Sequence, residues 1–250
     1  MTKIVNFPAV LSVLSFFVLW GSAIGGALLC KRHGPLEKDQ REDFAIVQGA
    51  ALTLLGLLIG FTFSMAISRY DQRKSYEATE ANAIGTEYLR VGLLPPADAA
   101  RLRELLKNYL DQRVKFYTSR NSRSLQLIDA DTARVEDQLW SAVRNRAEIQ
   151  PNATVALVAS GMNAVLDSAG FTQAAWWNRI PFEAWVLLAS IAICCNLLVG
   201  YSAHRPSLML LILPLAVSIS FFLIADIESP RGGIVRVTPT NLVNLAGNLR

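Results

Sequence analysis

Four long runs without a charged residue alternate with polar segments along this 250-residue chain. They cover residues 4–30, 44–68, 184–204 and 206–225, and none of them contains Lys, Arg, Asp or Glu. About 20 mostly apolar residues in a helix cross the hydrocarbon core of a bilayer, so each run is long enough to span it. The pattern therefore predicts a polytopic membrane protein with four transmembrane helices.

The polar segments predict how the spans are paired. A 13-residue loop joins the first two runs and a short link joins the last two, so each pair is expected to form a hairpin. With four spans, both termini and the long insert lie on the same side of the membrane. Seven Lys or Arg lie near the span ends on that side and five on the other, and this excess of positive charge favours a cytoplasmic insert. We expect a first hairpin, a cytosolic insert, a second hairpin and a cytosolic C-terminal segment, at residues 1–68, 69–181, 182–225 and 226–250.

Helical periodicity continues through the insert. Two prolines and an aspartate within residues 95–98 are typical of a helix start, and an apolar stripe follows them. A second helix is expected after the turn near Asn121, with a break near residues 129–131, and a third after Pro151. The C-terminal segment has the only pattern typical of a strand, at residues 234–237, and a helical pattern after it. The expected fold class is an all-α membrane protein with a helical insert between spans 2 and 3.

Charge is distributed as unevenly as hydrophobicity. Only 18% of the residues are charged, against about 25% in soluble domains, and 28 of the 44 charged residues lie in the insert. The net charge of +4 comes without a basic stripe interleaved with aromatic residues, so no nucleic-acid partner is expected. The three cysteines have the spacing of neither a disulfide framework nor a zinc site.

Signatures of enzymes are missing from the sequence. It has no Gly-x-Ser-x-Gly motif, no Gly-Lys-Ser/Thr phosphate loop, no His-Glu-x-x-His motif and no dinucleotide-binding glycine pattern. The predicted spans contain no Asp, Glu, Lys or Arg, whereas an intramembrane enzyme usually has an ionisable group within a span. We expect no enzymatic activity, no cofactor and no metal site.

Along one line that begins in the second run, ten of eleven positions are small or polar, and Ile67 is the exception. At the helical period this line continues into the charged insert, which predicts one helix of roughly 40 residues. Either another helix packs closely against the line, or several copies of the helix surround an axis and the line borders an aqueous path. We call this line the small-residue stripe, and it consists of Gly49, Thr53, Gly56, Gly60, Ser64, Ile67, Asp71, Ser75, Ala78, Asn82 and Gly85.

Polar residues beyond the second run are candidates for a cytosolic vestibule on the same helix. Asp71 lies on the stripe just past the membrane run, and Ser75 and Asn82 follow it. Glu80 and Glu87, seven residues apart, are candidates for the same vestibule. For these two glutamates, buried contacts with Arg90 or Arg101 are the alternative.

Four segments of the chain have the character of family motifs. They are LLGLLIGFTFSMA at residues 54–66, RYDQR at 69–73, EANAIGTEYLR at 80–90 and DIESPRGG at 226–233. Together they resemble the bacterial bestrophin-like domain family, and the resemblance extends over nearly the whole chain in the order and number of spans. It implies a relation to bestrophins, which are pentameric ion channels with four spans per subunit, cytosolic ends and a pore lined by the second span.

The resemblance also implies where a pore would be narrowest. When residues 70–73 are matched to the bestrophin Tyr-Asp-Arg-Trp segment after the pore helix, the bestrophin neck falls on Gly56, Gly60 and Ser64. True bestrophins have bulky apolar residues at this neck. Either the neck is wider in this chain, or the helix packs and conducts nothing.

Asp226 and Glu228 form an acidic segment before Pro230. The resemblance places this segment where eukaryotic bestrophins build a calcium clasp. Calcium prefers about six to eight oxygen ligands, and two carboxylates at this spacing supply too few. We therefore expect no calcium site here.

Two functions follow from the sequence. The first is a passive ion channel of the bacterial inner (plasma) membrane, a homopentamer by resemblance, with Gly56, Gly60 and Ser64 as the neck. Asp71 would form a charged ring at the cytosolic mouth of this channel and favour cations among the small inorganic ions. The second is a non-conducting membrane scaffold or sensor, in which the stripe is a packing groove and the cytosolic helical bundle binds a protein partner.

Overall fold

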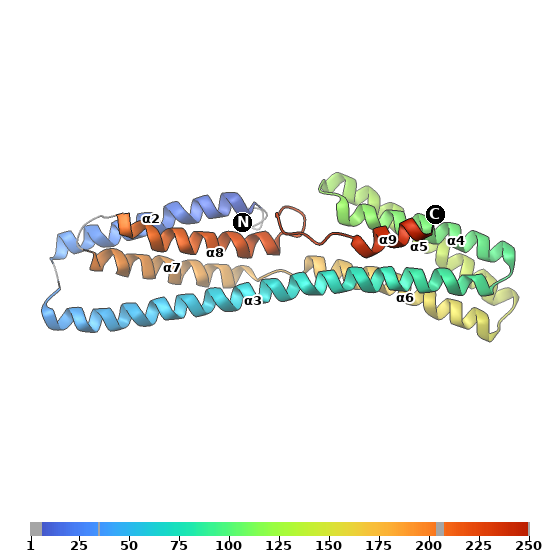
Figure 1. The fold of residues 1–250 in the computed structure, drawn as a ribbon, viewed down its shortest axis with the longest axis horizontal. Coiled ribbons are helices and arrows are strands. Elements are labelled where there is room, and N and C mark those ends of the chain that lie inside the picture. Colours follow the sequence, from blue (N-terminus) through green and yellow to red (C-terminus); the bar gives the residue numbers. More distant parts are fainter. Residues whose placement is uncertain (1–6, 35, 204–207, 250) are drawn as a thin grey trace. The chain divides into compact units, whose positions relative to one another are not determined.

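The computed structural model describes residues 7–34, 36–203 and 208–249, and within them every regular element is a helix (Figure 1). This confirms the predicted all-α class. Residues 4–6, 204, 206 and 207 of the predicted spans lie outside the described residues. Four helical segments are long and apolar enough to cross a membrane, and each contains most or all of one charge-free run: Pro8–His33, Asp39–Leu93, Ala153–Ser202 and Leu208–Glu228.

The chain divides into two compact units. The first, here called the membrane unit, comprises Met1–Arg69 and Arg179–Arg236. The second, here called the insert unit, comprises Tyr70–Asn178 and Val237–Arg250. Helix α3 (Lys38–Arg90) is continuous over 53 residues and contributes to both units, which confirms the prediction of one long helix and extends it.

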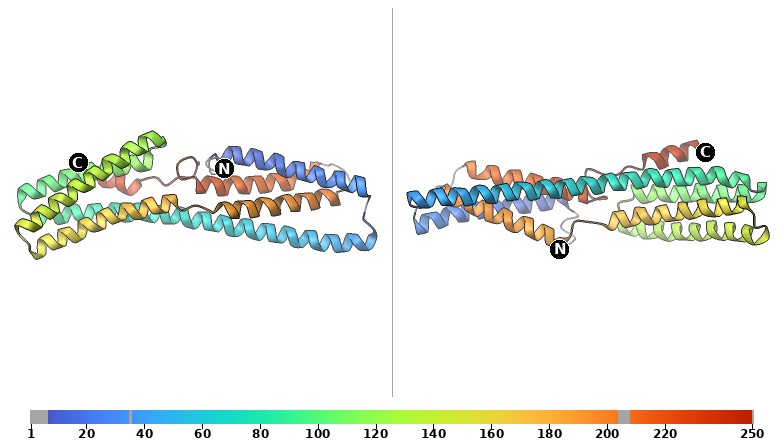
Figure 2. Two further views of the ribbon diagram at one scale, coloured as in Figure 1. Left: turned by 180° about the vertical axis from the view of Figure 1, so that it is seen from behind. Right: turned by 90° about the horizontal axis from the view of Figure 1, so that it is seen from below.

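The membrane unit contains helices α2 (Pro8–His33), α7 (Phe182–Ser202) and α8 (Ile212–Glu228) beside the first part of α3. A short 3-10 helix, η2 (Leu208–Leu211), precedes α8. Helix α2 lies against both α7 and α8, as two views of the ribbon show (Figure 2). Many bulky apolar side chains of these helices stay exposed, as is expected of surfaces that face lipid.

Glycines allow the closest helix contact of the membrane unit. A Cβ at Gly200 of α7 would overlap the carbonyl oxygen of Ala23 and lie only 2.7 Å from its carbonyl carbon. On α2, a Cβ at Gly26 would overlap the carbonyl oxygen of Leu197 and lie 2.8 Å from the amide nitrogen of Tyr201. Small residues therefore let the backbones of α2 and α7 touch, which is a common way to hold membrane helices together.

The insert unit packs α4 (Pro96–Thr118), α5 (Ser122–Ile149) and α6 (Ala153–Trp177) with the second part of α3. A single 3-10 turn, η1 (Val91–Leu93), connects α3 to α4. Apolar residues at helical spacing on these four helices form one core, which confirms the predicted stripes. Its fully buried members include Ile84, Leu102, Leu106, Tyr109, Val135, Leu139, Val158 and Met162.

Local sequence signals set the starts of these helices. Pro96 occupies the first turn of α4, where a missing N–H costs no helical bond. The side chains of Asn121 and Asn152 accept hydrogen bonds of 2.9 Å from the amides of Arg123 and Val155, and so cap α5 and α6. The predicted starts near residues 95–98, at Asn121 and after Pro151 are therefore confirmed.

The predicted break in the second insert helix is wrong. Helix α5 runs without interruption through residues 129–131. Asp129 is exposed, and Asp131 forms an ion pair of 3.1 Å with Arg134 one turn later. Both acids thus lie on the solvent side of an amphipathic helix, where they do not compete with its backbone bonds.

The predicted strand at residues 234–237 is wrong as well. This segment is an irregular connection between α8 and a final helix, α9 (Thr240–Asn248), and the predicted C-terminal helix is confirmed. The amides of Ile234 and Val235 donate hydrogen bonds of 2.7 and 2.8 Å to the carboxylate of Asp226. The backbone of this segment therefore finds a side-chain partner instead of a neighbouring strand.

Candidate functional site

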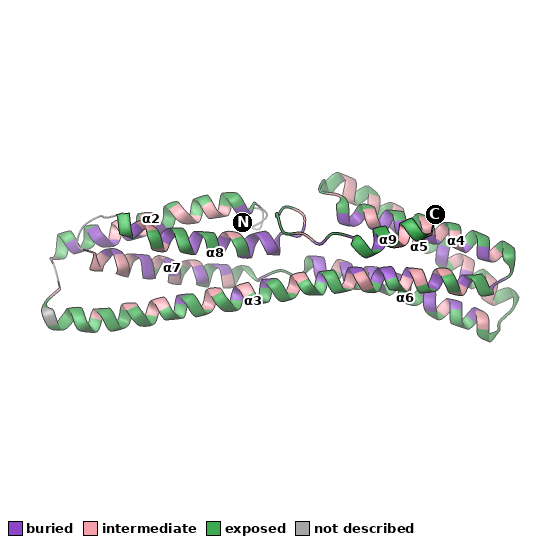
Figure 3. Cartoon of the chain, viewed as in Figure 1, coloured by how far each residue is buried: buried purple, intermediate pink, exposed green. Residues whose placement is uncertain are grey.

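The small-residue stripe lies on the uncovered side of α3. From Gly49 to Ser75 all of its members are exposed (Figure 3). The buried residues of the same helix lie about half a turn round it: Leu55 and Ser64, nine positions apart, point to opposite sides. Within one chain, α3 therefore packs through one face and leaves the stripe on the other.

In the membrane part of α3 the glycines of the stripe have no steric partner among the described residues. A Cβ at Gly49, Gly56 or Gly60 would meet no described atom within 4 Å, in contrast to Gly26 and Gly200. The small side chains of this part of the stripe are thus not required by packing within the described chain.

A bulky apolar flank borders the stripe in the membrane part of α3. Leu54, Leu57, Phe61 and Met65 are all exposed, and they lie next to the stripe around the helix. Large apolar side chains of this kind are the usual lipid-facing residues of a span. The exposed surface of α3 therefore has two distinct chemical faces.

The far end of the stripe is covered by the C-terminal helix. A Cβ at Gly85 would lie 3.2 Å from Cδ1 of Leu245 on α9, and Ala78 is half-buried. Asn82 between them stays exposed, as do Asp71 and Ser75. The polar residues predicted for the stripe are thus available to water or to a neighbouring molecule in the described chain.

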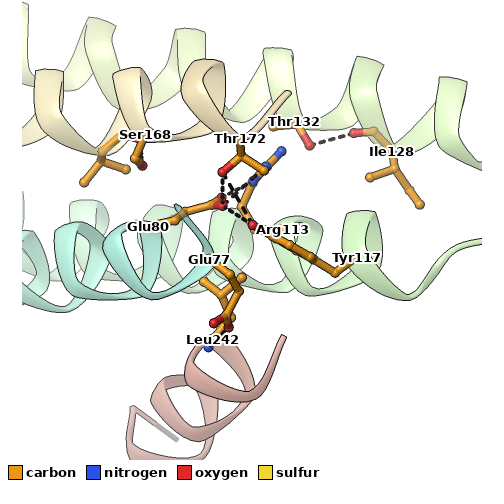
Figure 4. Close-up of polar contacts among 10 residues, drawn as sticks. Glu77, Glu80, Arg113, Tyr117, Ile128, Thr132, Ser168, Thr172 and Leu242 are labelled. Atoms are coloured by element: carbon orange, nitrogen blue, oxygen red, sulfur yellow. Dashed lines mark hydrogen bonds and ion pairs between the residues drawn. The ribbon is translucent and has the colours of Figure 1, made fainter. Parts of the chain in front are cut away.

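Glu80 and Glu87 are buried inside the insert unit, which corrects the expectation that they line an aqueous vestibule. Glu80 forms an ion pair with Arg113 and accepts hydrogen bonds of 3.1 Å from both Tyr117 Oη and Thr172 Oγ1 (Figure 4). Burial, together with the adjacent Glu80 charge, raises the pKa of Tyr117 well above its ordinary value. Glu80 thus joins α3 to α4 and α6, and its buried partner is Arg113 instead of the expected Arg90 or Arg101.

Sequence reasoning missed two anchoring residues of α3. The carboxylate of Glu77 accepts bonds of 2.9 and 3.0 Å from the amides of Asn241 and Leu242, and so caps the start of α9. Buried Arg73 donates hydrogen bonds to the carbonyl oxygens of Ala175 and Asn178, where α6 ends. Their spacing could have indicated a buried role, because charged residues recur every three or four positions on the side of α3 away from the stripe.

The acidic C-terminal segment is used to fix the backbone. Asp226 holds the connection before α9, as described above. Glu228 is buried, accepts a hydrogen bond of 2.9 Å from the amide of Ile180 and forms an ion pair of 3.3 Å with Arg69. Across residues 7–34, 36–203 and 208–249 no group of three or more His, Cys, Asp or Glu is placed to hold a metal ion.

Comparisons with known proteins give the family of the chain. Solved structures of three mutant forms of a bacterial bestrophin homologue from Klebsiella pneumoniae are similar to it, with TM-scores of 0.68, 0.66 and 0.65. Each is 14% identical in sequence, and the matches cover 97%, 94% and 94% of this chain and 97%, 97% and 98% of theirs. At this identity the likeness shows a shared fold. A comparison with curated proteins finds no match. The model of the bestrophin-like domain matches residues 17–242, and the chain therefore belongs to the bestrophin-like domain family.

Proposed function

We propose that this protein is an ion channel in which several copies place α3 around a common axis and conduct ions passively along the small-residue stripe. The observation that carries the proposal is the exposure of this stripe, where the described chain provides no cover for Gly56 or Gly60. Lipid-facing surfaces are normally built from large apolar side chains, and the flank beside the stripe already has them. A face of glycine and hydroxyl groups is better suited to water and ions.

Membership of the bestrophin-like family supports the same arrangement. In the proposed channel Gly56, Gly60 and Ser64 form the neck, and their small side chains leave it wide. Asp71 forms a ring of carboxylates at the cytosolic mouth, which favours cations over anions. Ser75 and Asn82 continue the polar lining. By resemblance the assembly is a homopentamer in the bacterial inner membrane, with both termini and the insert unit in the cytoplasm.

The direct test is current through purified protein in planar bilayers, combined with its oligomeric mass in detergent. Gly60→Leu adds a large side chain to the proposed neck and is expected to reduce unitary conductance while the oligomer stays intact. Leu57→Phe adds bulk to the lipid-facing flank one turn away and serves as the matched control, with conductance unchanged. An intact oligomer that passes no current at any salt or voltage would refute the proposal. Loss of assembly in Gly60→Leu would instead favour the non-conducting scaffold or sensor.

A further inference from the structure

A buried carboxyl near the end of α3 has no hydrogen-bond partner. The side chain of Glu87 is fully buried, and neither carboxyl oxygen has a hydrogen-bond partner among the residues that the structure describes. The partly exposed guanidinium of Arg90 lies 4.0 Å away, from Nη1 to Oε2. A carboxylate in such surroundings is costly, because burial favours its neutral form.

Gly161 on α6 provides the space that this carboxyl occupies. A Cβ at Gly161 would overlap Oε2 of Glu87, and it would lie 2.9 Å from the carboxyl carbon of Glu87 and 2.6 Å from Nη1 of Arg90. The carboxyl group thus rests directly on the backbone of α6. Helices α3 and α6 therefore meet at this carboxyl group.

Few charges lie near Glu87. Burial raises the pKa of its carboxyl to about 8, and the positive charge of Arg90 opposes this rise only in part. Helix α9 has no charged residue, and Asp167, the one acidic or basic residue of α6, is exposed. On the other neighbouring helices, Arg103 and Lys107 of α4 lie over the ring of Tyr88, and Arg146 of α5 pairs with Asp98 of α4.

We propose that the contact between Glu87 and Gly161 is a pH-sensitive lock between α3 and α6. The protonated carboxyl keeps the two helices together, and release of its proton to solvent loosens them. The closed contact holds this proton up to a higher pH than an exposed glutamate does, so the closed state binds more protons than the open one. Its stability therefore falls as the pH rises from about 4.5 to about 8, and levels off above that.

Hydrogen exchange of the full-length protein in detergent tests the lock without measuring current, so its result is independent of the proposed channel. The backbone amides of α6 around Gly161 report the opening of the contact. After correction for the intrinsic exchange rate, their opening constant is expected to rise up to about tenfold per pH unit between pH 6 and 8 and then level off. In Glu87→Gln, which keeps the shape but cannot ionise, the same amides should show no such dependence.

Two further variants make the test specific. Glu148→Gln removes an exposed carboxylate that pairs with Arg144, and it should keep the pH dependence of the native chain. Arg90→Gln removes the charge that lowers the pKa of Glu87, so the opening constant of this variant should level off at a higher pH. The lock is overturned if the opening constant of the native protein does not depend on pH, or if Glu87→Gln keeps this pH dependence. It is also overturned if the opening constant of Arg90→Gln levels off at the same pH as that of the native protein.

Discussion

Replacement of Gly200 by alanine tests how the membrane unit is held together. The new methyl group would lie 2.7 Å from the carbonyl carbon and 3.0 Å from Cα of Ala23, where ordinary contacts of a Cβ are 3.4–4 Å. The neighbour on this side is backbone, which has no rotamer to change. Helices α2 and α7 must therefore move apart, and the contacts beside this point are lost.

The expected loss of folding stability follows from this overlap. Overpacking of one methyl group in a well-packed interior destabilises by about 1–3 kcal/mol. This corresponds to roughly a 5- to 150-fold change in the folding equilibrium, since about 1.4 kcal/mol is a factor of ten. Thermal unfolding of the purified protein in detergent, followed by tryptophan fluorescence, is expected to show a lower midpoint for Gly200→Ala than for the native chain.

Gly60→Ala is the matched control because it makes the same change at a glycine with no described atom within 4 Å. Alanine is also the better helix former, by up to about 1 kcal/mol, so the midpoint should stay or rise. Destabilisation of a single subunit by Gly60→Ala as large as that by Gly200→Ala would show that the overlap with Ala23 is not the cause. An unchanged midpoint in Gly200→Ala would show the same.

Substitutions at three other positions of α3 probe its buried contacts and its exposed stripe. Glu77→Ala removes the acceptor at the start of α9 and should weaken docking of that helix by about 1–3 kcal/mol, seen as faster exchange of its amides; unchanged protection would contradict the capping role. Glu80→Ala leaves buried Arg113 without its carboxylate and should lower the free energy of unfolding by about 3–5 kcal/mol, whereas a loss below about 1 kcal/mol would mean that the ion pair is not needed. Asp71→Asn should reduce the preference for cations and Asp71→Lys should reverse it, and a reversal potential that neither variant moves would remove Asp71 from the conduction mechanism.

Much of the fold could be predicted because its causes are local. Charges are excluded from the hydrocarbon core, so the absence of Lys, Arg, Asp and Glu marked four helices that are long and apolar enough to span it. Proline in a first turn and asparagine at a cap satisfy the orphan groups at the start of a helix, so Pro96, Asn121 and Asn152 marked three starts. The small-residue stripe likewise predicted one continuous helix.

The errors at residues 234–237 and at Glu80 and Glu87 arose where a distant residue supplies the partner. Residues 234–237 have the composition of a strand, but Asp226 takes two of their amides. Glu80 and Glu87 look like surface residues of a charged helix, yet Arg113, 33 positions beyond Glu80, neutralises one, and Gly161 accommodates the other. The local sequence pattern cannot predict such pairings, because the two groups meet only after the chain has folded.

The order of residues places a face of small side chains on α3, but only the packing of the helices shows that its membrane part has no partner in the described chain. Gly26 and Gly56 are the same residue type, both within apolar runs. One is pressed against the backbone of α7, and the other has nothing near it in the described chain. Only the packing of α2 and α7 on each other, and of α3 through its opposite side, separates a glycine that joins two helices from a glycine without a neighbour in the described chain.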